Sequence, residues 1–187
     1  MGVPSGYTSA QVVQAVPVVT SSGMTLIQAA TTTTAASVTV SNIFSATYSL
    51  YKIFITITSG TTGRNQLRFT TSGTPNTSSL YSFSYGGTDG TAGYTESSSG
   101  TPQDKGVFQQ NNNGNGFTEL TVSNPFQSAV TRSVFNSHAF YGGAPTQYAV
   151  SGGILFNDTT SFDGIHLFNQ NANTFTYTTT VYGLAIS

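Results

Sequence analysis

The chain has 187 residues, of which only five are Lys or Arg and six are Asp or Glu, giving a formal net charge of -1. The surface of a soluble domain is usually about a quarter charged residues, whereas here hydroxyl and amide groups must make most of the contacts with water. A surface with so few charges is typical of a protein that sits against a partner. The shortage of acids and bases disfavours most enzyme chemistries, and the scattered basic residues disfavour nucleic-acid binding. The absence of cysteine excludes disulfides, and no apolar run is long enough for membrane insertion.

Residues 1–36 differ from the rest of the chain in having no charged residue. They contain Pro4 and Pro17 and end in the low-complexity tract Thr31 to Ala36, so we predict an N-terminal anchoring arm followed by a linker. An extended apolar segment cannot bury its own side chains and therefore needs a partner surface. The alternative is that Tyr7 to Ile27 forms the first strand of the following domain, but the prolines favour the arm. The residues expected to make the anchoring contacts are Val12, Val13, Val16, Val18, Val19, Leu26 and Ile27.

The rest of the chain has the pattern of short strands, because Thr, Val, Ile, Tyr and Phe recur in runs separated by Gly, Asn, Ser and Pro, without a helical apolar stripe. The clearest strand is Tyr48 to Thr58, in which Tyr51, Ile53, Ile55 and Ile57 recur every second residue, and we expect these four to line the core. In chain order, the expected strands are Met24–Gln28, Val38–Val40, Tyr48–Thr58, Gln66–Thr71, Leu80–Tyr85, Val107–Gln110, Leu120–Val122, Ser133–Phe140, Tyr148–Phe156, Gly164–Phe168 and Thr176–Ile186. Roughly nine to eleven strands at this spacing predict an all-β chain, a jelly-roll-like two-sheet β-sandwich with an extended N-terminal arm.

The segments between these strands are predicted turns. They are Ser59–Arg64, Ser72–Ser78, Gly86–Gly93, Ser97–Asp104, Asn111–Gly116 and Asn169–Asn173. The glycine-rich part, Gly86 to Gly90, lacks the Lys and the following helix that a phosphate-binding loop requires. We therefore expect no nucleotide and no cofactor.

Few side chains in the sequence suit a metal. Asp163 and His166 lie three positions apart, so on a strand they point to opposite faces, and we interpret them as a turn Asp and a strand His with an ordinary partner. Asn157, Asp158 and Asp163 offer oxygen ligands for calcium but lack a repeated ligand spacing. His138 has no acid nearby in the sequence, and no nucleophile-elbow pattern marks a Ser–His–Asp triad.

A polysaccharide hydrolase needs two carboxylates around the scissile bond. The candidates are Asp89, Glu96, Asp104, Glu119, Asp158 and Asp163. Three of them, Asp89, Glu96 and Asp104, fall in predicted loops, where a carboxylate usually stays solvated or bonds a turn amide. We predict no catalytic residue, no metal site and no enzyme activity.

Glycan binding without cleavage is the stronger hypothesis for a ligand. Tyr81, Tyr85 and Tyr94, with Asn and Asp in neighbouring loops, could stack on a sugar ring and hydrogen-bond to its hydroxyls. The alternative, which we favour, is that these tyrosines cover the ends of the sandwich and pack against their neighbours, because Trp, the strongest stacking residue, is absent.

Several runs occur in a characteristic order along the chain: Pro4–Gln14, Phe44–Ile53, Leu67–Thr74, Val122–Pro125 and Phe175–Ala185. In this order they resemble a β-sandwich domain common in virion proteins of tailed bacteriophages, especially marine ones. The runs are spread over the sequence from Pro4 to Ala185, and their order carries the resemblance more than any single motif does. Because the motifs are structural, no catalytic residue is transferred from the group.

The resemblance implies a non-enzymatic structural protein that is located in the virion and assembled in the host cytoplasm. The first of two possible roles is a capsid decoration (cement) or head-fibre subunit anchored by residues 1–36, with the β-sandwich in residues 37–187. The alternative role is a tail-fibre adhesin that recognises a host-surface glycan. The implied partners are the major capsid or tail proteins, and the implied assembly is a homotrimer. The uncharged Thr174 to Thr180 stretch is the surface we expect a sister subunit to cover.

Overall fold

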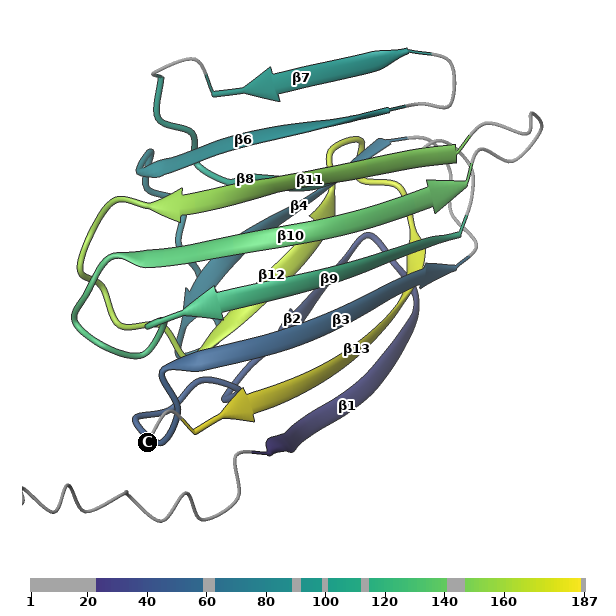
Figure 1. Ribbon diagram of the computed structural model, residues 1–187. Helices are drawn as coiled ribbons and strands as arrows, with labels where there is room; N and C mark the ends of the chain where they lie inside the picture. Colours follow the sequence, from purple (N-terminus) through teal and green to yellow (C-terminus); the bar gives the residue numbers. More distant parts are fainter. Residues whose placement is uncertain are drawn as a thin grey trace, which may run out of the picture.

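The computed structural model describes residues 23–58, 63–88, 92–98, 101–111, 115–140 and 147–185, and the regular elements in these ranges are all β-strands (Figure 1). The strands are β1 (Met24–Ala35), β2 (Ser37–Val40), β3 (Leu50–Thr58), β4 (Gly63–Thr71), β5 (Thr74–Pro75), β6 (Tyr81–Thr88), β7 (Gly93–Ser97), β8 (Gly106–Asn111), β9 (Gly116–Ser123), β10 (Thr131–Phe140), β11 (Gln147–Phe156), β12 (Gly164–Asn169) and β13 (Phe175–Leu184). The all-β prediction is therefore confirmed.

Two antiparallel sheets face each other. The large sheet has eight strands in the order β1-β13-β3-β9-β10-β11-β6-β7, and the small sheet has the order β2-β12-β4-β5, with β8 also paired to β4. The small sheet lies behind the large one in Figure 1, and the chain passes repeatedly from one sheet to the other. This crossing is the feature of a jelly roll, although β9, β10 and β11 form a meander within the large sheet. The predicted two-sheet sandwich is confirmed.

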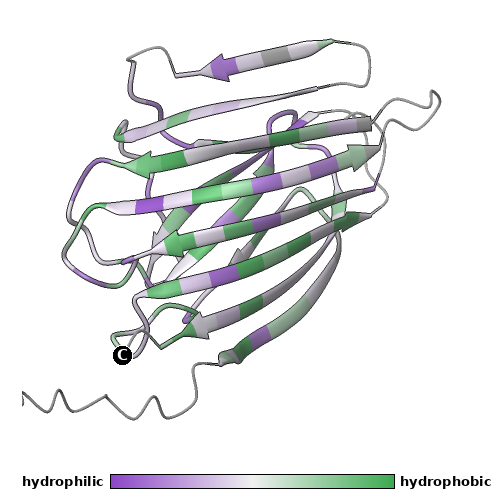
Figure 2. Ribbon diagram, viewed as in Figure 1, coloured by the Kyte–Doolittle hydropathy of each residue, from purple (hydrophilic) through white to green (hydrophobic). Residues whose placement is uncertain are grey.

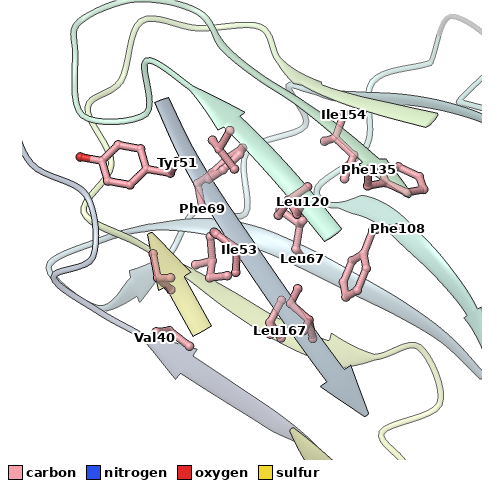
Figure 3. Close-up of a cluster of buried hydrophobic side chains, with 14 of the residues drawn as sticks. Val40, Tyr51, Ile53, Leu67, Phe69, Phe108, Leu120, Phe135, Ile154 and Leu167 are labelled. Carbon is pink, nitrogen blue, oxygen red and sulfur yellow. The ribbon is translucent and has the colours of Figure 1, made fainter. Parts of the chain in front are cut away.

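The core lies between the sheets and follows from the two-residue period of the strands. Hydrophobic and polar residues are interleaved along the strands of the large sheet (Figure 2), and on β3 the residues Tyr51, Ile53, Ile55 and Ile57 are all fully buried, as predicted. Ile53 and Leu120 from the large sheet lie with Leu67 and Leu167 from the small sheet in the same cluster (Figure 3). Burial on this face fixes the register of each strand, because a slip of one residue would turn the apolar side chains outward.

A group of aromatic rings joins the two sheets at the β6 side of the core. The ring of Phe69 on β4 stacks on Phe162 with a centroid distance of 5.0 Å. Phe156 on β11 meets Phe162 and Tyr81 edge to face, at 4.9 and 4.8 Å. Each such pair contributes about 0.5–1.5 kcal/mol beyond the burial of its area.

The linker predicted at Thr31 to Ala36 is wrong for its first five residues, because they continue β1. This strand pairs antiparallel with β13, and Thr31 Oγ1 lies 3.1 Å from Thr178 Oγ1 across the pair. Threonine is β-branched and suits a pleated strand, so a low-complexity Thr tract has a stable place at a sheet edge. The sandwich therefore begins at β1 rather than at Ser37. The first twenty-two residues, including Val12, Val13, Val16, Val18 and Val19, lie outside the described ranges.

One further prediction is corrected and one stays open. The stretch Thr174 to Thr180 lies mostly in β13, whose backbone pairs with β1 and β3, so cover of its outer face by a sister subunit stays a prediction. Gly93 to Ser97, expected to lie between turns, forms β7 and pairs with β6. The pairing of β13 with β1 joins residues far apart in the chain, whereas β6 and β7 are a local hairpin in which Thr88 pairs with Gly93.

Candidate functional site

Five of the eleven charged residues gather at one end of the sandwich. Arg64 on β4 forms an ion pair with Glu96 on β7, which links the small sheet to the large one. Arg68, also on β4, forms an ion pair with Asp104 and donates from Nε to the Asp104 carbonyl at 2.9 Å. Lys105 Nζ lies 2.7 Å from Asp104 Oδ1. These groups are only partly exposed, so they interact more strongly than fully solvated ion pairs would.

A pocket of about 420 Å³ lies among these charges, and we call it the β7 pocket. It opens where β6 and β7, at the upper margin of the large sheet in Figure 1, face residues of β4, β8 and β12. Its lining combines charged groups, side-chain amides and an apolar wall: Arg64, Gln66, Phe83, Glu96, Gln103, Lys105, Val107, Phe168, Asn169, Gln170 and Ala172.

Hydrogen bonds and ring contacts hold the charged groups of the pocket in place. Glu96 Oε2 accepts a hydrogen bond of 2.6 Å from the hydroxyl of Tyr85. Burial by itself would raise the pKa of Asp104, but hydrogen bonds from Lys105 and Arg68, and their charges, hold that pKa below its ordinary value. The Arg68 guanidinium lies over the ring of Phe168, 4.6 Å from its centroid. The Asp104 carboxylate is therefore kept ionised, and both Asp104 and Glu96 are held by partners within the chain before any ligand arrives.

The structure does not support a tyrosine platform for a sugar at Tyr81 and Tyr85. Tyr81 is fully buried, where its hydroxyl accepts from Phe69 N at 2.9 Å and donates to Asn76 O at 3.2 Å, and burial raises its pKa. Tyr85 is 4% exposed, and its hydroxyl donates to Glu96. The favoured alternative, in which these tyrosines pack against their neighbours, therefore holds for these two residues, because both occupy the inward phase of β6. The side chain of Tyr94 lies outside the described part of the structure.

The interpretation of Asp163 and His166 is confirmed. Asp163 Oδ2 accepts from the backbone N–H of Ser72 at 2.7 Å, and Oδ1 accepts from Thr70 Oγ1 at 3.1 Å, as a turn carboxylate would. His166 Nδ1 lies 2.9 Å from Thr39 Oγ1 on the neighbouring strand. Burial, followed by the nearby Arg68 charge, lowers the pKa of His166, so the neutral imidazole is favoured.

Asp158, one of the residues considered for calcium, also makes a turn hydrogen bond. Asp158 accepts from the backbone N–H of Thr159 at 2.7 Å, which is again a turn hydrogen bond. Within the described ranges, no group of three or more His, Asp or Glu side chains is placed to hold a metal ion.

Exposed apolar side chains lie on the large sheet. Met24 and Leu26 on the edge strand β1 are 51% and 56% exposed, and Val134 on β10 is 61% exposed. A shallow depression of about 410 Å³ beside Val134 is lined by residues of β6, β10 and β11. Of the predicted anchoring residues, Leu26 is therefore available to a partner, whereas Ile27 packs against the hydrophobic core.

The β7 pocket was missed from the sequence. Arg64 and Glu96 are 32 positions apart, and Arg68 and Asp104 are 36 apart, so no local spacing brings them together. The cluster arises only when β4 and β7 meet across the sandwich.

In the described part of the chain, no helix has the length and apolar character required to cross a membrane. No protein-family model matches the chain, and neither the curated proteins nor the solved structures contain a significant match.

Proposed function

We propose that this chain is a non-enzymatic structural protein of a tailed-phage virion. We favour a capsid decoration or head-fibre role over a tail-fibre role. The observation that carries the proposal is the pairing of a charge-poor sandwich with exposed apolar side chains, Met24 and Leu26 on β1 and Val134 on β10. Exposed apolar side chains on a domain with few charges favour association with a partner. The order of the sequence runs that resemble virion β-sandwich domains supports the same function.

The use of the acidic residues also favours a structural role. Glu96, Asp104 and Glu119 each form an ion pair with a basic residue. The other two described carboxylates, Asp158 and Asp163, accept turn hydrogen bonds. Carboxylates engaged in this way support the fold rather than proton transfer, which needs a group placed beside a reacting atom.

The proposal is tested by adding the purified, labelled protein to phage particles that lack it. The full chain should bind, and electron microscopy should place the label on heads. A chain that starts at Gly23 keeps β1 and should fold by circular dichroism, but it should fail to bind if residues 1–22 are the anchor. Unimpaired binding of the shortened chain would refute the anchoring role, and failure of the full chain to bind would refute the virion role.

The alternative is a tail-fibre adhesin, and the same experiment separates it from the first role. Label on the tails instead of the heads would favour it. Its tyrosine platform is lost because Tyr81 and Tyr85 are buried, so the β7 pocket is the place in the described structure that supports glycan binding.

A further inference from the structure

We infer that the β7 pocket binds one saccharide unit that carries a carboxylate, such as a uronic acid or a sialic acid. The inference concerns the pocket alone and does not depend on whether the protein sits on a phage head or a tail. It rests on the size of the pocket, the kind of groups that line it and the sign of their charges.

The size and lining of the pocket suit a small polar ligand. A volume of about 420 Å³ lies in the range of roughly 300–1,000 Å³ that small-molecule sites occupy. Gln103 and Gln170 each present a side-chain amide, which can both donate and accept a hydrogen bond. Gln66 and Asn169 are buried in the lining, and the Asn169 amide already bonds Arg64 O and Asn171 N. A sugar hydroxyl has the same dual capacity as the two presented amides, so they match a ring that carries hydroxyls around its edge. Phe83, Phe168 and Val107 add an apolar wall for the C–H face of such a ring.

The charges select for a ligand that has both hydroxyls and one negative group. Two cations, Arg64 and Lys105, and one carboxylate, Glu96, line the pocket, which gives a net charge of 2 - 1 = +1. The ammonium of Lys105 carries three N–H donors, of which one is directed to Asp104, so it can also bind a ligand carboxylate. Glu96 would repel a compact anion such as phosphate but can accept from a sugar hydroxyl.

The polar groups are held in place without a ligand, which lowers the entropic cost of binding. Glu96 is fixed by Arg64 and by the hydroxyl of Tyr85, and Arg68 rests on Phe168 while it binds Asp104. Preorganised groups bind more tightly because less side-chain freedom is lost on association. Only one carboxylate lines the pocket, so the pair that glycoside hydrolysis requires is missing from its lining, and the site binds a sugar without cleaving it.

The test is a nuclear magnetic resonance titration of the full chain with methyl glycosides of glucuronic acid, galacturonic acid and N-acetylneuraminic acid. The methyl glucoside and galactoside serve as neutral partners of the two uronides, because they carry a C6 hydroxymethyl group in place of the carboxylate, and the methyl ester serves as the neutral partner of the N-acetylneuraminic acid glycoside. At least one acidic glycoside should shift the side-chain amide signals of Gln103 and Gln170, and its neutral partner should bind about tenfold more weakly, as expected for the loss of one charge-assisted hydrogen bond.

Lys105→Gln should weaken binding of the acidic glycoside about tenfold and leave binding of the neutral one unchanged. Lys52→Gln is the matched control, because Lys52 also forms an ion pair, with Glu119, and its side chain is 32% exposed against 29% for Lys105. Thermal unfolding of both variants checks that the fold is retained. Failure of every glycoside to shift the pocket signals up to its solubility limit would overturn the inference. Equal binding of acidic and neutral partners, or equal effects of the two lysine variants, would overturn the role assigned to the charge.

Discussion

Two buried tyrosines on neighbouring strands differ in what their hydroxyl groups contact. Tyr51 Oη accepts from Ser45 N at 2.7 Å and donates to Ser45 O at 2.9 Å. Tyr177 is as deeply buried, but its hydroxyl has no hydrogen-bond partner among the described residues, and burial raises its pKa. The same chemical group therefore stabilises the fold at one position and carries an uncompensated desolvation cost at the other.

Replacing each tyrosine by phenylalanine should separate these two effects. Tyr51→Phe leaves the Ser45 backbone groups without their partner and should lower the free energy of unfolding by about 1–3 kcal/mol. Tyr177→Phe should leave that free energy unchanged or raise it. Urea unfolding of the two variants measures the difference, and equal losses in both would contradict the assignment.

The burial of Ile55 on the core face of β3 leads to a second prediction about single residues. Ile55 is fully buried, so Ile55→Ala should lower the free energy of unfolding by about 2–5 kcal/mol through lost burial and a residual cavity. Its neighbour Thr56 lies on the opposite face of the strand, and Thr56→Ala should cost less than about 1 kcal/mol. A loss below about 0.5 kcal/mol for Ile55→Ala would contradict the packing of this strand.

At the scale of the element, β1 belongs to the folded sandwich. Ile27 packs against the core, and the strand covers the edge of β13 along its length. A chain that starts at Ser37 removes these contacts and leaves β13 as an uncharged edge, which favours aggregation. Its thermal midpoint should fall by more than about 4 °C relative to a chain that starts at Gly23, since about 1 kcal/mol corresponds to roughly 2–4 °C at this length. Equal midpoints in calorimetry would show that β1 adds nothing to stability.

Two adjacent glycines of β11 allow a matched comparison of substitutions within one element. A Cβ added at Gly152 would lie 2.4 Å from both Ser84 O and Tyr85 Cβ, whereas at Gly153 its closest neighbour would be Ser133 O at 3.2 Å. Gly152→Ala must displace β6 and should cost about 1–3 kcal/mol, the usual penalty for overpacking. Gly153→Ala should cost clearly less. The order of the two unfolding free energies tests whether β6 packs this closely on β11.

At the scale of the whole molecule, the exposed apolar residues predict self-association that resists salt. Met24, Leu26 and Val134 are exposed, while the described ion pairs lie within the chain. Screening weakens the electrostatic part of an interaction only, so an assembly held by apolar contacts should persist in molar salt. Light scattering should find the same oligomer, a trimer if the virion resemblance holds, at low and at molar salt. A monomer in both conditions would contradict association of the free protein, and dissociation by salt would contradict its apolar character.

The sequence by itself determined the fold class and the faces of the strands. Tyr51, Ile53, Ile55 and Ile57 were placed correctly because the alternation of side chains along a strand is a local property of the backbone. The low charge likewise follows from composition alone. Asp163 and His166 were also interpreted correctly, since a turn Asp next to a strand start and a strand His are local assignments.

Only the tertiary structure decided which strands pair and which side chains meet. The Thr31 tract resembles a linker until β13 supplies its partner, and Tyr81 and Tyr85 resemble surface rings until the phase of β6 turns them inward. The β7 pocket is the extreme case, because Arg64 and Glu96 come together across two sheets. Pairing between distant strands depends on the packing of the entire core, and no local pattern in the sequence encodes it.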